Sequence, residues 1–148
     1  MQKHLPDGRV QHFEGLGGQE RLARETFADG RVRIYVGEPN AERMTREEYS
    51  DGQVQHYEGK MGEEKMVRTE FPSGNIDYYE GPRSVERKVR TDFPDGQVQY
   101  YEGNMDAEYI VRIEFRDGEA QYFLSVCICV SAPDTVSPFT LVRLVSTC

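Results

Sequence analysis

Apolar and polar positions alternate along most of the chain in short runs, and clusters of Gly, Asp and Pro separate one run from the next. Residues 53–58 read QVQHYE, and residues 65–71 read KMVRTEF. Both runs are rich in β-branched and aromatic residues and are too short for typical helices. The pattern therefore predicts two strands in each unit, with a tight turn at each Asp-Gly or Ser-Gly pair that joins strands into a β-hairpin.

The hairpin pattern recurs with a strict period. Six Asp-Gly or Ser-Gly pairs stand 22 residues apart, with no insertion between them: Asp7-Gly8, Asp29-Gly30, Asp51-Gly52, Ser73-Gly74, Asp95-Gly96 and Asp117-Gly118. Other structural positions recur in the same phase, among them Gly59, Gly81, Gly103, Arg68, Arg90 and Arg112. Hairpins with short connections pair edge to edge, so we predict an all-β fold, an elongated antiparallel meander sheet of 22-residue hairpin repeats. At ~4.8 Å per strand, each unit advances ~10 Å and the array is ~50 Å long.

The turn between the two strands leaves two registers open. A two-residue loop places Phe71 opposite Ile76 and Arg68 opposite Tyr79, which puts aliphatic and Phe residues on one face and Tyr, Arg and Glu on the other. A three-residue loop with a bulge, such as residues 94–96, mixes the two sets. The hydrophobic pattern favours the two-residue loop. In either register the Asp column is interpreted as turn chemistry, because a calcium site needs several converging oxygen ligands.

Charged residues also recur in phase. Glu58, Glu64, Arg68 and Glu70 have equivalents along the array, so each Arg is expected to have acidic partners. Their presence in unit after unit indicates a structural ladder, because an active site is normally unique. His12 and His56 share a phase but lie two units, ~20 Å, apart, too far to share a metal ion. The sequence therefore predicts a protein that is not an enzyme, with no metal and no cofactor.

Composition narrows the classes of partner. The 148 residues include 30% charged and 37% hydrophobic residues, and the net charge is −8. This balance argues against nucleic-acid binding and disfavours anionic membrane surfaces. The first thirty residues contain no apolar leader, and no run is apolar and long enough to span a membrane. We expect a soluble, cytoplasmic protein.

The stretches "DGQVQHYEG", "SGNIDYYEG" and "DGQVQYYEG" resemble the Asp-Gly and Tyr-x-Gly half of MORN repeats. The resemblance covers about five and a half units, from Leu5 to about Phe123. It implies β-hairpins in an extended sheet. It also implies a non-catalytic scaffold or protein-interaction module, and some members of that family are associated with membranes.

Two groups of residues are candidates for partner binding. One is a set of rigid amphipathic rings that could form one face: His56, Tyr57, Tyr78, Tyr79, Tyr100 and Tyr101. Its alternative role is cross-strand packing. The other group lies in the loops after each Tyr-x-Gly, which differ from unit to unit and contain Met61, Arg83 and Met105. The alternative for these loops is unconstrained drift.

Residues 124–148 break with the repeat. They form an apolar segment with two charged residues, and they hold all three cysteines. Three interpretations stay open: a capping strand with a flexible end, a partner-binding tail, or a stretch foreign to the natural fold. We thus divide the chain into a repeat array, 1–123, and a non-repetitive tail, 124–148.

The sequence as a whole favours a non-catalytic scaffold that binds another protein. A peripheral membrane-surface module is the alternative, and a carbohydrate-acting enzyme using the repeated carboxylates is a minor one. The open sheet edges also allow a homodimer.

Overall fold

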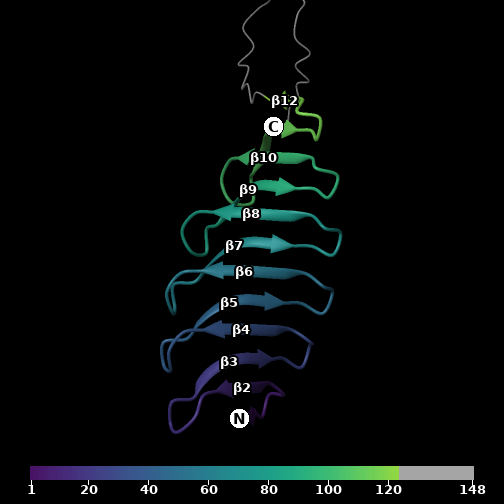
Figure 1. Ribbon diagram of the computed structural model, residues 1–148. Coiled ribbons are helices and arrows are strands. Elements are labelled where there is room, and N and C mark those ends of the chain that lie inside the picture. The colour runs from purple at the N-terminus through teal and green to yellow at the C-terminus, as the bar shows by residue number, and fades with distance from the viewer. Residues whose placement is uncertain (124–148) are drawn as a thin grey trace, which may run out of the picture.

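The computed structural model describes residues 1–123, which form one elongated sheet of twelve antiparallel strands (Figure 1). The strands lie in the sheet in chain order, so each hairpin pairs with the next. Their bounds are β1 Gln2–His4, β2 Val10–Glu14, β3 Arg21–Thr26, β4 Val32–Val36, β5 Arg43–Glu48, β6 Val54–Glu58, β7 Lys65–Glu70, β8 Ile76–Glu80, β9 Arg87–Asp92, β10 Val98–Glu102, β11 Tyr109–Glu114 and β12 Ala120–Tyr122. The predicted elongated all-β meander is confirmed.

Connections of two kinds mark the two long sides of the array. Asp-Gly or Ser-Gly turns join each odd strand to the next even strand, on the right in Figure 1, and we call this side the turn edge. Longer loops join each even strand to the next odd strand, on the left, and we call this side the loop edge. The loop edge consists of residues 15–20, 37–42, 59–64, 81–86 and 103–108.

The turn-edge loops contain three residues. The amide of Phe71 donates to the carbonyl of Asn75 at 2.9 Å, and the amide of Gly74 donates to the carbonyl of Phe71 at 2.8 Å. Arg68 consequently lies opposite Tyr78. The predicted two-residue loop is wrong and the three-residue alternative is confirmed. The reason is the bulge that Gly74 forms at a φ of 86°, which takes up one more residue before the ladder resumes.

Aspartate stabilises these turns as predicted. The carboxylate of Asp51 accepts a hydrogen bond from the amide of Gln53 at 2.9 Å. Four other turns repeat this contact, through Asp7, Asp29, Asp95 and Asp117. A side chain that bonds the backbone two residues onward holds the turn closed, which explains the Asp column without a bound ion.

The register assigns each side chain to one of two faces. We call one the arginine face; it carries Arg24, Arg46, Arg68, Arg90 and Arg112. The other is the tyrosine face; it carries Phe13, Tyr35, Tyr57, Tyr79 and Tyr101. Ile76 lies with Arg68 on the arginine face, whereas Phe71 lies with Tyr79 on the tyrosine face. The predicted separation of aliphatic and Phe residues from Tyr is therefore wrong, because the added loop residue shifts one strand relative to the other.

A β-bulge interrupts each loop-edge hairpin, and a glutamate from the next unit bonds the backbone beside it. In β8–β9 the register shifts between Tyr78 and Tyr79. The amide of Lys88 then donates to Glu108 Oε1 at 3.0 Å. The same bond joins Leu22 to Glu42, Met44 to Glu64 and Met66 to Glu86. This glutamate column, expected to pair with Arg, instead ties each loop to the unit before it.

The interior of the sheet is thin and largely polar. Only Ala23 and Val32 are buried hydrophobic residues among residues 1–123. The buried polar residues are Glu25, Glu47, Thr69 and Thr91, all on the tyrosine face. Hydrogen bonds and ion pairs therefore supply much of the stabilisation that buried apolar side chains provide in thicker domains. The interpretations offered for residues 124–148 concern residues outside the described part of the chain.

Candidate functional site

The six rings proposed as one interaction face divide between two faces. His56, Tyr78 and Tyr100 lie on the arginine face, opposite Arg68 or Arg90 or Arg112 across the strands. The remaining three, Tyr57, Tyr79 and Tyr101, lie on the tyrosine face. The single aromatic face predicted from the sequence is wrong, because neighbours such as Tyr78 and Tyr79 point to opposite sides of a strand.

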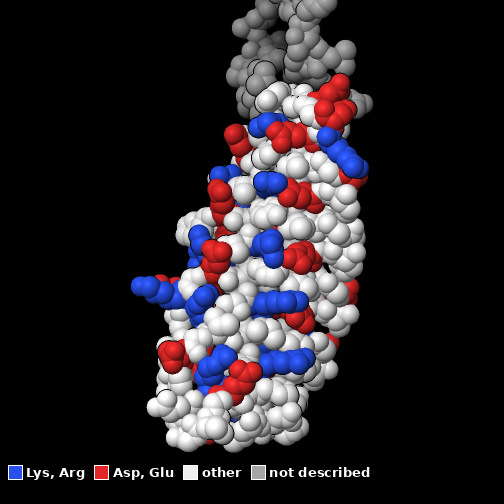
Figure 2. All heavy atoms as spheres, in the orientation of Figure 1, with Lys and Arg blue, Asp and Glu red and all other residues white. Residues whose placement is uncertain are grey.

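On the arginine face, rings and charges contact one another. The guanidinium of Arg90 lies 5.3 Å from the ring centre of Tyr78 and 5.9 Å from that of Tyr100. Its Nε also donates to Asp92 at 2.5 Å. Basic and acidic side chains alternate in columns along the array (Figure 2). Four arginines of this face thus pair with an acidic residue two positions onward in the same strand, as the recurring Arg and acidic residues predicted: Arg46, Arg68, Arg90 and Arg112.

His56 occupies the same column in an altered environment. Its Nε2 lies 3.1 Å from Glu70 Oε1 and 3.2 Å from a terminal nitrogen of Arg68. Partial burial, followed by the charge of Arg68, lowers the pKa of His56 below its ordinary value. The neutral ring is therefore favoured, in keeping with a packing role for this histidine.

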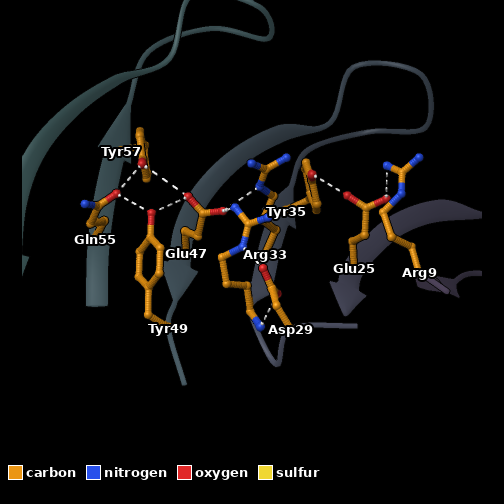
Figure 3. Close-up of polar contacts among 10 residues, drawn as sticks. Arg9, Glu25, Asp29, Arg33, Tyr35, Glu47, Tyr49, Gln55 and Tyr57 are labelled. Atoms are coloured by element: carbon orange, nitrogen blue, oxygen red, sulfur yellow. Dashed lines mark hydrogen bonds and ion pairs between the residues drawn. The ribbon is translucent and has the colours of Figure 1, made fainter. Parts of the chain in front are cut away.

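The tyrosine face holds a buried polar network in its N-terminal half (Figure 3). Glu47 is 4% exposed. It accepts hydrogen bonds from Arg33 Nε at 2.8 Å, from the hydroxyl of Tyr49 at 3.1 Å and from the hydroxyl of Tyr57 at 3.5 Å. One unit earlier, Glu25 accepts bonds from Arg9, Gln11 and Tyr35. Both carboxylates have several donors within the protein.

Burial in this network perturbs the phenols. Desolvation, followed by the charge of Glu47, raises the pKa of Tyr57 far above its ordinary value. Desolvation also raises the pKa of Tyr35, with Glu25 as the next cause, and the pKa of Tyr79, with Asp77 as the next cause. The hydroxyls of Tyr35 and Tyr57 act as neutral donors, which is a structural role.

Alkaline pH is expected to destabilise the protein through these tyrosines. The folded state holds the phenol protons more tightly than the unfolded chain, so the stabilisation is complete below the ordinary tyrosine pKa of about 10 and is lost as pH rises above it. Urea denaturation at a series of pH values from about 8 to 11 should show a falling free energy of unfolding above about 10. The Tyr57→Phe variant should show a shallower fall. A pH-independent free energy of unfolding would contradict this expectation.

Exposed apolar side chains concentrate at the loop edge. Eight large hydrophobic residues are exposed among residues 1–123, and four of them lie in the loops: Leu16, Met61, Val85 and Met105. Val36 and Tyr109 stand directly beside loops, and none of the eight lies in an Asp-Gly or Ser-Gly turn. This distribution distinguishes the loop edge from the rest of the surface, because exposed apolar side chains that gather in one place mark interaction sites.

The loop residues proposed from the sequence lie together as expected of one edge. Met61 is 58% exposed and Met105 is 43% exposed. Arg83 lies in the loop between theirs, and its guanidinium donates to the carbonyl of Gly62. The variable loops also contain Leu16 and Val85, which the sequence did not single out as candidate binding residues. Both are large apolar residues between the Gly and the Glu of a loop, and this position could have identified them as exposed.

These loops are held in defined conformations. In the loop of Met61, the amide of Glu63 donates to the carbonyl of Lys60 at 2.9 Å. The amides of Ala41, Val85 and Ala107 make the equivalent bonds in other loops. Glu64 and its equivalents add the bonds to the preceding unit. The exposed side chains therefore stand on ordered backbone, which lowers the entropy lost when a partner binds.

Two open hollows line the turn edge. One lies near the N-terminal end, beside Arg9 and Phe27, and the other near the end of the described chain, beside Gln97 and Phe115. These positions are equivalent in the repeat, being 88 residues apart. In the first hollow the guanidinium groups of Arg31 and Arg33 lie 4.7 and 4.8 Å from the ring centre of Phe27. Protein side chains therefore occupy the ring that a ligand would contact.

Neither a metal cluster nor a membrane-spanning helix is found in the part of the chain that the structure describes. No group of three or more His, Cys, Asp or Glu side chains among residues 1–123 is arranged to hold a metal ion. No helix in that range is long and apolar enough to cross a bilayer.

Comparison with known proteins leaves the chain without a match. No family model matches it, and neither the curated proteins nor the solved structures contain a significant match. The resemblance to MORN repeats accordingly rests only on the Asp-Gly and Tyr-x-Gly motif residues.

Proposed function

We propose that this protein is a non-catalytic repeat scaffold that binds another protein through its loop edge. The observation that carries the proposal is the concentration of exposed apolar residues there, Leu16, Met61, Val85 and Met105, against none in the Asp-Gly or Ser-Gly turns. Protein interfaces use exposed apolar side chains at their centre and polar residues around them. Five successive loops on one rigid sheet provide such an arrangement.

The two faces support this choice by contrast. Arg90 on the arginine face contacts Tyr78, Tyr100 and Asp92, and Glu47 on the tyrosine face contacts Arg33 and two tyrosines. A partner binding either face would have to replace these contacts, which costs free energy. The side chains of Met61 and Met105 have more free surface and need no such exchange.

The bonding of the repeated carboxylates favours a scaffold over a carbohydrate-acting enzyme. Glu25 and Glu47 each accept bonds from arginine and tyrosine, and the Glu64 column accepts bonds from backbone amides. A pair of glycosidase carboxylates needs one acid free to protonate the substrate and one base or nucleophile free to face it. The engaged groups of the array fit a structural ladder better.

Replacing two exposed methionines of the loop edge with glutamate is expected to weaken binding of the partner. We would immobilise the wild-type chain, the Met61→Glu/Met105→Glu variant and the Ser50→Glu/Pro94→Glu variant, and quantify the proteins that each captures. The two variants add the same charge at the same spacing of 44 residues, on opposite edges. The amount of a true partner captured by the first variant should fall at least tenfold, because two buried apolar contacts of ~1 kcal/mol each are removed. The second variant should capture as much of it as wild type. Equal capture by both variants would contradict the proposal.

A further inference from the structure

Exposed apolar side chains stand in three consecutive loops of the loop edge; Met61 and Met105 are equivalent positions two units apart, and Val85 lies in the loop between them, two residues after the equivalent position, Arg83. Met61, Val85 and Met105 lie in three consecutive loops and are 58, 50 and 43% exposed. Successive loops are two strands apart, so their spacing is ~10 Å. A partner that contacts all three must present apolar groups at a similar interval.

Acidic residues outnumber basic ones in the loops that hold these apolar groups: residues 59–64, 81–86 and 103–108 contain five acidic and two basic residues, a net formal charge of −3. The five loops contain eight acidic and two basic residues, a net formal charge of −6. The six turns of the opposite edge, residues 5–9 and their equivalents, contain six acidic and three basic residues, a net charge of −3. Charge complementarity therefore calls for a basic partner.

One amide of each of these three loops is hydrogen-bonded within its loop. The amides of Glu63, Val85 and Ala107 donate within their own loops at 2.9, 3.1 and 3.0 Å. Met44 and Met66, next to the loops, donate to glutamates of the following unit. The loop edge joins the ends of paired strands and is not an edge strand of the sheet, so it offers no ladder to an added β-strand, and a partner must satisfy its own backbone.

An α-helix meets these requirements. It satisfies its backbone internally, and residues i and i+7 lie on one side of it, separated by ~10.5 Å. This matches the loop spacing of ~10 Å within about 1 Å. In an extended strand the residues nearest to ~10 Å apart, i and i+3, point to opposite sides and do not reach one edge together.

We propose that the loop edge binds a basic amphipathic helix with an apolar side chain at every seventh residue. The exposed apolar groups of three loops contact the apolar stripe, and the acidic loop residues contact Lys or Arg beside it. The inference rests on the proposed function, since it names the kind of partner that the same edge accepts.

Synthetic peptides test the helix directly. One 22-residue peptide of Ala and Lys carries Leu at every seventh position, a second has the same composition with Leu at every fifth position, and a third carries Leu at every third position between prolines. Fluorescence anisotropy with the full chain should give at least tenfold tighter binding of the first peptide than of either other, weakening as salt increases. Equal binding of the first two peptides, or tightest binding of the Pro-rich peptide, would overturn the helix.

Variants and a second assay separate this inference from the proposed function. Met61→Glu/Met105→Glu should lose the tight binding at least tenfold, and Ser50→Glu/Pro94→Glu should retain it; circular dichroism checks that both variants are folded. If the captured proteins depend on the loop edge while the seventh-residue peptide is not preferred, the helix inference fails and the proposed function stands. If capture is insensitive to the loop edge, the proposed function fails and the helix inference fails with it. Light scattering that shows a dimer abolished by the loop variant, without peptide binding, would make the occupant a second copy of the chain and overturn the helix.

Discussion

Replacing Gly59 with alanine is expected to lower the free energy of unfolding by about 3 kcal/mol. Gly59 follows β6 and has a φ of 128°, in the region that L side chains rarely adopt. A Cβ at this position would lie 2.5 Å from the carbonyl oxygen of Glu63 and 3.1 Å from its carbonyl carbon. Backbone conformation and backbone contact both oppose alanine, and the loop has to move to accept it.

Gly62→Ala in the same loop is the matched control. Gly62 also has a positive φ, 78°, but no heavy atom lies within 4 Å of a Cβ built there. This variant should lose only about 1 kcal/mol, the cost of the left-handed conformation alone. Urea denaturation followed by circular dichroism measures both. Equal losses for the two variants would mean that the contact with Glu63 does not restrict the loop.

Replacing Glu47 with alanine is expected to cost about 3 kcal/mol, at the lower end of the range for breaking a buried ion pair. Its carboxylate is the shared acceptor of Arg33, Tyr49 and Tyr57, and its side chain is 5% exposed. Removing it leaves the guanidinium of Arg33 without its carboxylate in a site that water reaches poorly, whereas the hydroxyls of Tyr49 and Tyr57 keep the side-chain oxygen of Gln55 as an acceptor. Arg33 is 33% exposed, so partial solvation limits the loss.

The neighbouring residue provides the control. Glu48 lies on the opposite face and pairs with Arg46 at 2.9 Å, with both side chains more than a third exposed. Glu48→Ala should therefore cost about 0–1 kcal/mol. A loss for Glu48→Ala equal to that for Glu47→Ala would contradict the assignment of the two faces.

The next unit of the repeat suggests a second substitution that should restore part of the stability lost when Glu47 is replaced. Arg33 pairs with Glu47 across the strands, whereas one unit later Gln55 pairs with Thr69. Glu47→Thr alone leaves Arg33 without its carboxylate, but Arg33→Gln/Glu47→Thr copies the pair of the next unit. The double variant should be about 1 kcal/mol more stable than Glu47→Thr. Additive losses would show that the two positions are not coupled.

The fold could be predicted because the period and the local pattern agree. Two short strands and two turns in each 22-residue unit leave a hairpin meander as the consistent arrangement, and the twelve strands follow it. The register was missed, since Ser73-Gly74 is compatible with both two- and three-residue loops. The deciding feature is the φ of 86° at Gly74, a backbone property that the hydrophobic pattern does not encode.

The candidate site could be predicted only in part. Met61, Arg83 and Met105 were identified because their loops differ among units, and this signal does not depend on register. The grouping of Tyr78 with Tyr79 failed for another reason, because adjacent residues of a strand point to opposite faces in any register. The role of Glu64 was also hidden, because its partner is the amide of Met44 in the preceding unit, freed from the ladder by a bulge. Without knowledge of the bulge, the amide of Met44 is expected to bond within the strand ladder, so no side-chain acceptor is expected for it.

The most direct test of binding at the loop edge is nuclear magnetic resonance of the methionine methyl groups of the full chain. Met61 and Met105 stand exposed on the loop edge, while Met44 and Met66 lie half-buried in β5 and β7. On addition of a captured partner, the account predicts that the Met61 and Met105 signals shift or broaden while those of Met44 and Met66 change little. Shifts confined to Met44 and Met66, with Met61 and Met105 unchanged, would place the partner on the sheet itself and contradict the account.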